Sequence, residues 1–191
     1  STAAAWGTPA LIFPSGNTHE SPRLAPNDLT IYYGENGNIM SATRTAVGQP
    51  WSMPAPLAQV NTTNYEKWLA VCNGGYFLVS RANGAHQQLY EGQLGAGNGP
   101  GTLSSLSDPS GDDISSFLSP DCTTAYLGGS FTHVNGVAAA HLAAVDTTTG
   151  AVKTAFAHNV SGQVQTVRYT HGQVIIGGIF TGVFTPTEAG A

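Results

Sequence analysis

Charged residues are scarce in this sequence of 191 residues. Asp, Glu, Lys and Arg together make up 9% of the chain, against about a quarter in ordinary globular proteins. Uncharged polar side chains must therefore keep the protein in solution, a composition that favours a secreted, periplasmic or cell-surface location. Six Lys and Arg against eleven Asp and Glu give a formal net charge of −5. This balance argues against nucleic acid as a partner, because binding a phosphate backbone needs clustered cations.

Cysteines and long apolar runs are equally sparse. Cys72 and Cys122 are the only cysteines, too few for a disulfide framework or, by themselves, for a structural zinc site. No apolar run approaches the roughly 18 residues of a membrane-spanning helix, so membrane insertion is not expected. Sustained helical periodicity is also missing, which predicts few helices. What the chain has instead is 24 Gly and 11 Pro, which mark frequent turns.

A repeat in the sequence accounts for these frequent turns. The stretch YLGGSFT at 126–132 returns as IIGGIFT at 175–181. Around it lie four copies of an apolar anchor, a polar turn and a second apolar run, the pattern of two strands joined by a tight turn. Their anchors are Leu24, Leu69, Leu118 and Val167, which are 45, 49 and 49 positions apart. With further strand-like segments after each hairpin, every copy holds about four short strands, as a propeller blade does.

These spacings predict an all-β fold, a single β-propeller domain over residues 1–191 with four blades of about 45–49 residues. Trp6-Gly-Thr-Pro-Ala10 matches Trp51-Ser-Met-Pro-Ala55 at an offset of 45. The N-terminal segment is therefore expected to complete the last blade, so that the N- and C-terminal segments share a blade and close the ring. The alternative is four blades of a larger ring that another chain or a further segment completes.

Several segments also resemble known propeller repeats. Residues 21–33, 37–44 and 119–126 are similar to the WD-like, TolB-type propeller repeats of bacterial secreted and periplasmic proteins. Residues 128–136 and 177–181, with their Gly-Gly-x-Phe-Thr motif, resemble a second kind of bacterial propeller repeat. The resemblance implies a scaffold that binds proteins, peptides, glycans or cell-wall components, and it transfers no catalytic motif.

Aromatic and histidine side chains are the candidate ligand-binding groups. Flat aromatic faces can bind sugars or peptide side chains, and imidazoles at predicted turns can reach a ligand. The candidates are Trp68, Tyr65, Tyr90, His133 and His171. For Trp6 and Trp51, which recur in register, packing within the fold is the favoured interpretation.

An acidic stretch offers a weak metal site. Asp108, Asp112 and Asp113 place three carboxylates within six residues, and calcium prefers oxygen ligands on a flexible loop. The spacing is not that of an EF-hand, so a solvated connection between blades is favoured, and no cofactor is expected other than this calcium.

Two further features receive structural interpretations. The Gly-Gly pairs are expected to permit a bulge or a close approach of neighbouring backbone. The two cysteines fall at nearly the same place in successive repeats, where neighbouring blades diverge from the axis. They are therefore predicted to be free, partly buried thiols, although a single disulfide is the alternative.

The function favoured by the sequence is a non-catalytic extracellular binding or structural module. It would recognise a glycan or a protein through the propeller loops or the central funnel. One alternative is a hydrolase or lyase on a propeller scaffold, whose acids would come from Glu20, Asp28, Glu35, Glu66 and Asp146. Another is a subunit that assembles with itself through unpaired blade edges. Enzyme activity, the ligand, the oligomeric state and the biological process stay open at this point.

Overall fold

The structure, a computed structural model, describes residues 11–13, 17–95, 104–106 and 111–184. In these residues the fold is all-β, as predicted, and the strands are antiparallel. The helical structure of this part of the chain is a single 3₁₀ turn, Thr154–Phe156. None of the described residues forms a helix with the length and apolar character needed to cross a membrane.

The strands form three larger sheets and several two-stranded pairs. The first sheet consists of β1 (His19–Leu24), β2 (Thr30–Glu35), β3 (Asn38–Thr43) and β4 (Ala55–Pro56). The second sheet consists of β5 (Glu66–Val71), β6 (Tyr76–Asn83), β7 (His86–Gln93) and β8 (Ser104–Ser105). The third sheet consists of β9 (Asp113–Leu118), β10 (Thr124–Gly129) and β13 (Leu142–Asp146). The remaining pairs are β11 (His133–Val134) with β12 (Val137–Ala138), β14 (Asn159–Val160) with β17 (Val183–Phe184), and β15 (Gln163–Thr170) with β16 (Gln173–Ile179).

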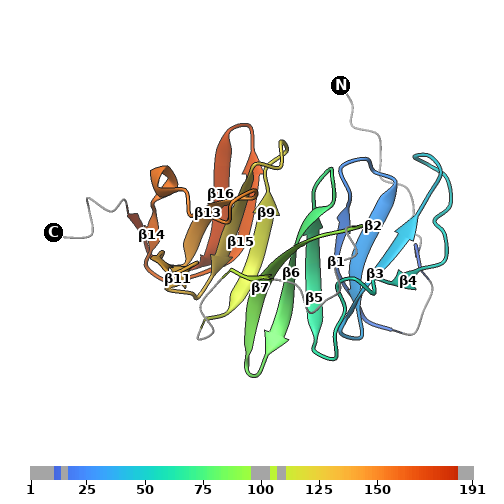
Figure 1. The fold of residues 1–191 in the computed structure, drawn as a ribbon, viewed down its shortest axis with the longest axis horizontal. Helices are drawn as coiled ribbons and strands as arrows, with labels where there is room; N and C mark the ends of the chain where they lie inside the picture. The colour runs from blue at the N-terminus through green and yellow to red at the C-terminus, as the bar shows by residue number, and fades with distance from the viewer. Residues whose placement is uncertain (1–10, 14–16, 96–103, 107–110, 185–191) are drawn as a thin grey trace.

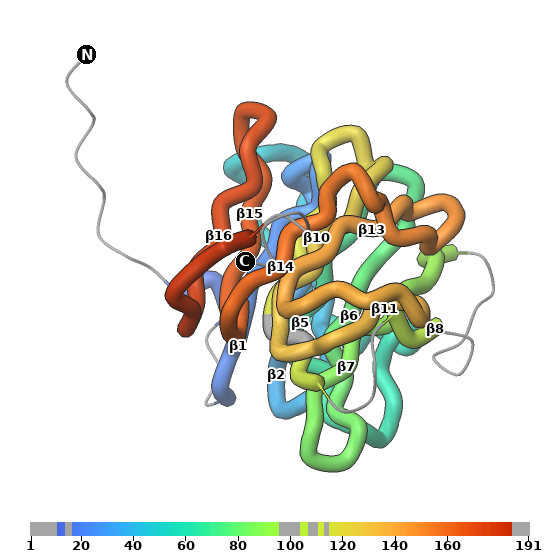
Figure 2. Tube along the Cα trace, turned by 90° about the vertical axis from the view of Figure 1, so that its left-hand side faces the viewer, coloured from blue at the N-terminus to red at the C-terminus, as the bar shows by residue number. Residues whose placement is uncertain are grey.

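The sheets follow one another in space in the order of the sequence (Figure 1). Their first strands are neighbours, with β1 beside β5, β5 beside β9, and β9 beside β15. Figure 2 shows the molecule end-on, with the β15–β16 hairpin in red and β1 and β2 in blue. Because the first strands lie together, the turns that connect them to the second strands lie together as well.

The predicted repeat is visible in these turns. In each sheet, a backbone N–H donates to the carbonyl three residues earlier, namely Asp28 to Ala25, Gly75 to Cys72 and Cys122 to Ser119. The two Gly-Gly motifs also occupy equivalent places, because both lie on second strands, β10 and β16. Leu24 and Leu118 immediately precede the residue that opens the turn. In the second sheet the residue before the turn is Val71, not the predicted anchor Leu69. In the last hairpin it is Tyr169, not the predicted anchor Val167.

Apolar side chains fill the spaces between successive sheets. The alternation of buried and exposed positions along each strand directs one set of side chains to each face. Between the first and second sheets lie Ala25, Tyr32, Ile39, Val60, Leu69, Phe77 and Val79. Between the second and third sheets lie Trp68, Leu78, Leu89, Leu106, Ala125, Leu127 and Phe131, with their neighbours. Leu142, Val160, Val164 and Val167 join the third sheet to the last hairpin.

The glycine pairs have the structural role that the sequence predicted. A Cβ atom on Gly128 would lie 2.6 Å from Cγ1 of Val164 and 2.7 Å from Cγ2 of Val167. A Cβ atom on Gly178 would collide with the backbone carbonyl of Gln163. The strand register shifts beside both pairs, so the glycines permit bulges as well as close packing.

A Gly128→Ala variant is expected to lower the free energy of unfolding by about 1–3 kcal/mol, because the added methyl overpacks this contact. Chemical denaturation measures the loss. Adding Val164→Ala removes one of the two clashing side chains, so the loss in the double variant should be smaller than the sum of the single losses. Strictly additive losses would contradict the proposed contact.

Candidate functional site

A groove lies where the first strands of three sheets end in their turns. It has a volume of about 450 Å³. The residues that line it come from β1, β5 and β9 and from the turns that follow them: Arg23, Leu24, Pro26, Ala70, Val71, Cys72, Asn73, Ser116, Phe117, Leu118, Ser119, Pro120 and Cys122. The groove is therefore a product of the arrangement of the sheets, since no single repeat contains it.

Four side chains hold equivalent positions on the first strands, and three of them line this groove. Arg23, Ala70 and Phe117 each lie two residues before the residue that opens the turn. On β15, Thr170 is the last residue that pairs before the two-residue turn to Gln173. Arg168 lies two residues before Thr170 and therefore holds the same position. Side chains at equal positions on neighbouring strands point the same way. The repeat thus brings two arginines, one aromatic ring and one small residue to the same level.

The two arginines have no carboxylate partner among the described residues. Ion pairs form elsewhere in this part of the chain, and neither Arg23 nor Arg168 takes part in one. Arg168 donates from Nη1 to the carbonyl of Val167 at 2.7 Å, and its guanidinium carbon lies 5.6 Å from the ring centroid of Phe117. Arg23 is half-buried, and this burial lowers the pKa of Arg23, with a further lowering from the positive charge of Arg168. Arg23 therefore gives the groove a positive charge on this side.

A buried hydroxyl lies beside the same groove. Ser116 is only 1% exposed, and its Oγ has no hydrogen-bond partner among the described residues. Buried polar atoms are nearly always hydrogen-bonded, so this one is an exception. Because the Oγ atom is itself buried, it is not accessible to a group bound in the groove.

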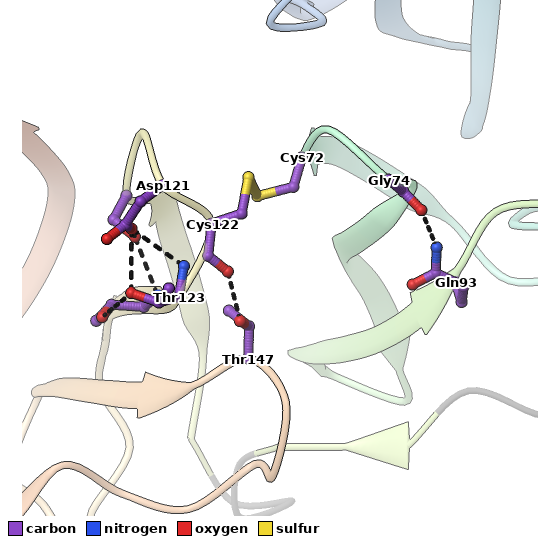
Figure 3. Close-up of a disulfide and its surroundings, with 9 residues drawn as sticks. Cys72, Gly74, Gln93, Asp121, Cys122, Thr123 and Thr147 are labelled. Atoms are coloured by element: carbon purple, nitrogen blue, oxygen red, sulfur yellow. Dashed lines mark hydrogen bonds between the residues drawn. A yellow bond between two sulfur atoms is a disulfide. The ribbon is translucent and has the colours of Figure 1, made fainter.

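Cys72 and Cys122 form a disulfide at the edge of the groove (Figure 3). Their Cα atoms are 5.7 Å apart. The prediction of free thiols was wrong, because it placed the two cysteines at nearly equivalent points of their repeats. Cys72 opens its turn, whereas Cys122 is three residues further along its own turn, in the left-handed region with φ of 60°. This offset directs the two side chains across the gap between the second and third sheets.

Hydrogen bonds hold the turn that carries Cys122. The carbonyl of Cys122 accepts from the hydroxyl of Thr147, and Asp121 Oδ1 accepts from the hydroxyls of Ser119 and Thr123 (Figure 3). These hydrogen bonds lower the pKa of Asp121, first that from the Ser119 hydroxyl and then those from Thr123. The Asp121 carboxylate is thus occupied within its own turn.

The five predicted ligand-binding residues lie on different elements of the fold. Trp68 is 6% exposed and packs between the second and third sheets. The guanidinium carbon of Arg81 lies 4.7 Å from the ring centroid of Tyr90. The Tyr65 hydroxyl donates a hydrogen bond to Oε1 of Glu20 at 3.0 Å. His133 and His171 are exposed, and each contacts the hydroxyl of the preceding threonine. The structure does not gather these side chains into one site, so their role in binding stays a prediction.

The predicted calcium site has only one side chain that the structure describes. Asp108 lies outside the described residues, and so does the side chain of Asp113. Asp112 accepts from the backbone N–H of Gln87 at 2.8 Å, while its own N–H donates to Ser130 at 2.8 Å. Asp112 thereby joins the second sheet to the third. Within the described ranges, no three acidic, histidine or cysteine side chains group as metal ligands.

The acids considered for catalysis mostly have structural partners. Glu66 binds Arg81, Glu35 lies 3.0 Å from His19, and Asp146 pairs with Lys153. Asp146 also accepts from backbone N–H groups of the turn after β13, which lower its pKa. These carboxylates are spread over the first three sheets and their turns.

A second hollow lies on the first sheet. Its volume is about 430 Å³, and it is lined by Ile12, Phe13, Tyr33, Glu35, Met40, Trp51, Ser52, Met53 and Pro54. Phe13 stacks on Tyr33 with ring centroids 5.0 Å apart. Trp51 is half-buried, and the guanidinium carbon of Arg44 lies 4.4 Å from the centroid of its ring. Trp51 is thus part of the packing of this edge. Trp6, its partner in the sequence repeat, lies outside the described residues.

The antiparallel sheets, with their first strands side by side around a shared groove, define an all-β, propeller-like protein. No family model and no curated protein matches the chain. Among solved structures, the chain is similar to TolB from Acinetobacter baumannii, with 14% sequence identity and a TM-score of 0.36. This comparison covers 80% of the present chain and 45% of the TolB chain, so the chain spans less than half the length of that protein.

Sequence reasoning did not select the three residues that supply the charge and the aromatic ring beside this groove. Arg23, Phe117 and Arg168 are ordinary residues in their local sequence. The signal that could have found them is the scarcity of charge, because two of only six basic residues fall at one position of the repeat. Recognising that position required the true start of each turn.

Proposed function

We propose that this protein is a non-catalytic binding module, exported from the cytoplasm, that binds a protein partner in the groove between the first strands. The observation that carries the proposal is the groove itself, which three sheets build together from exposed apolar and basic side chains. Leu24 is 50% exposed there, and Val71 and Leu118 are partly exposed beside it. Concave apolar surfaces with a few polar groups are the usual form of a binding site.

The composition of the groove favours a protein over a glycan. Asn73 is the only amide side chain among its lining residues, and Phe117 is the only aromatic one. The Phe117 ring lies under Arg168, so it offers little free surface for stacking on a sugar. Aliphatic side chains beside a positive charge suit a peptide segment with apolar and acidic residues.

The disulfide supports export. Disulfides persist in oxidising compartments such as the periplasm and the extracellular space, and they are rare in the cytosol. The bond between Cys72 and Cys122 agrees with the low charge of the chain, and both favour a secreted, periplasmic or cell-surface location.

The proposed architecture is a four-bladed propeller in which β15 and β16 begin the fourth blade. The segment around Ala55 and Pro56 forms β4 and pairs with β3. Residues 6–10 match the segment that leads into β4, so the N-terminal segment is the proposed outer strand of the fourth blade. A closed ring would leave no unpaired sheet edges.

A display library of random peptides on phage tests the proposed binding function. We expect selection on the native protein to enrich peptides that a Val71→Asp variant binds at least tenfold more weakly. The matched control is Met53→Asp, because Met53 is 90% exposed on the hollow of the first sheet and should leave this binding unchanged. Failure to enrich peptides, or equal binding by Val71→Asp, would overturn the proposal, and enrichment on a glycan array instead would favour a glycan ligand.

Self-assembly is a second candidate function, favoured by the edge of the last hairpin. In the described part of the chain, β16 pairs only with β15. Ile175 and Ile179 on β16 are 54% and 70% exposed, and the strand carries no charge. An apolar, uncharged edge strand is a template for pairing with another chain.

If β16 mediates assembly, light scattering of the native protein should give at least twice the chain mass of 19.7 kDa. An Ile175→Lys/Ile179→Lys variant should then be a monomer, because two charges on the edge oppose strand pairing. Val47→Lys is the control, since Val47 is 69% exposed in the loop after β3. A monomeric native protein would exclude this candidate.

A further inference from the structure

We infer that Arg23, which lines the groove, and Arg168, which lies over the groove residue Phe117, form a carboxylate-binding site that holds an acidic group of the bound partner. This inference rests on the proposed binding function and names the chemistry by which the groove recognises its partner. It starts from the positions of the two arginines, which are the same on the first strands β1 and β15.

The equivalent positions place both arginines near one aromatic ring, that of Phe117. Phe117, at the equivalent position on β9, lines the groove together with Arg23. Arg168 lies over the same Phe117 ring at 5.6 Å from its centroid. The ring therefore separates the second charge from the apolar core and orients it beside the groove. Ala70, at the fourth equivalent position, is small and leaves space between the larger side chains.

None of the described acidic residues neutralises the positive charge at this point. The chain has six Lys and Arg and a net charge of −5, so acidic partners are abundant in principle. Arg81 and Lys153 each have one, at 2.9 Å and 3.5 Å. Arg23 and Arg168 have none among the described residues, although they are close enough for the charge of one to lower the pKa of the other. Arg23 is half-buried and Arg168 is exposed, and two like charges close to one another disfavour the charged state unless an anion joins them.

The acidic groups in the adjacent turns do not supply that anion. Asp121, in the turn after β9, accepts hydrogen bonds from Ser119 and Thr123. Asp28, in the turn after β1, is exposed and forms no ion pair with either arginine. Two guanidinium groups match the acceptor oxygens of a carboxylate.

The surroundings favour a carboxylate attached to an aliphatic group over a free inorganic anion. Leu24, Val71 and Leu118 line the groove beside Arg23. They can bury the apolar part of a peptide residue while the arginines bind its charge. A free phosphate or sulfate would leave these side chains uncovered.

Titration with N-acetyl-leucine tests the site, because this probe carries one carboxylate and one aliphatic side chain. Side-chain Nε–H signals of the arginines are followed by NMR. We expect the Arg23 and Arg168 signals to shift, and N-acetyl-leucinamide, which lacks the charge, to bind at least tenfold more weakly. Arg23→Gln and Arg168→Gln should each weaken binding of the acid by at least tenfold. Affinity should also fall as NaCl is raised, since salt screens exposed charges.

The matched control is Arg44→Gln, because Arg44 lies over Trp51 at another edge of the first sheet and should not affect binding. Arg23→Lys keeps the charge and should retain part of the affinity, which separates loss of charge from loss of folding. Equal binding of acid and amide would overturn the inference. So would tighter binding of inorganic phosphate than of N-acetyl-leucine, or arginine signals that do not move.

The two proposals can fail separately. If the selected peptides bind the native protein and the Arg23→Gln variant equally well, the groove binds a partner without a carboxylate site. If N-acetyl-leucine binds and no peptide is enriched, the carboxylate site exists without the proposed protein partner.

Discussion

Replacing Arg81 by methionine is expected to lower the free energy of unfolding by about 3–5 kcal/mol, because it leaves the buried carboxylate of Glu66 without its charge partner. The Glu66 side chain is fully buried, and Arg81 Nε donates to its Oε1 at 2.9 Å. Arg81 also donates from Nη2 to the carbonyl of Val60 at 2.9 Å. Thr62 supplies the same carboxylate oxygen with a hydroxyl donor at 2.6 Å.

The position of this ion pair explains the size of the effect. It joins the start of β5 to β6, and it also fixes the loop that contains Val60 beneath the first and second sheets. Arg81 lies over the Tyr90 ring as well, so methionine loses a cation–π contact in addition to the charge. Thermal or chemical denaturation followed by circular dichroism measures the loss.

An exposed ion pair of the same chain provides the control. Lys153 and Asp146 are each 34% exposed and 3.5 Å apart, and Lys153→Met should cost less than about 1 kcal/mol. A Glu66→Leu/Arg81→Met double variant removes both charges and should recover much of the stability that Arg81→Met loses. If Arg81→Met cost no more than Lys153→Met, the pair would not have the buried character that the structure gives it.

Breaking the disulfide is expected to have an effect of similar size. The bond closes a loop between residues 50 positions apart, and the chain-entropy relation gives about 4 kcal/mol for a loop of this length. A Cys72→Ser/Cys122→Ser variant should lose this amount, and reduction of the native protein should lose the same. Because one serine already breaks the bond, Cys72→Ser alone should be as destabilised as the double variant.

Two observations check the origin of the loss. Without reductant, the native protein should expose no thiol to a thiol reagent after denaturation, and reduction should release two. Peptide binding should also fall in the reduced protein, because the disulfide lines the groove. Reactive thiols in the oxidised, unfolded protein would show that the cysteines are free and would restore the original prediction.

The contrast between these two features shows where sequence reasoning succeeded and where it stopped. Glu66 was considered as a catalytic acid, since its sequence position says nothing about burial. Its role became apparent only when the fold brought Arg81 and Thr62 to it. The cysteines were compared by an alignment that was two residues from the true turn in the second repeat. An error of this size hid the offset between Cys72 and Cys122, because turns admit small differences in length without changing the flanking pattern.

By itself, the sequence determined that this protein is built from repeated antiparallel strands. The repeated hairpins, the Gly-Gly pairs and the absence of helical periodicity are local properties of the chain, and local pattern decides the type of element. The place of Gly128 and Gly178 at close contacts follows from the same pattern.

Only the tertiary structure decided what the repeats build together. The groove, the disulfide and the approach of Arg168 to Phe117 all depend on which sheets become neighbours. Each of them joins side chains far apart in the sequence. Such contacts depend on the relative placement of whole sheets and on the exact residue at which each turn begins, and the pattern of apolar and polar residues along the chain specifies neither.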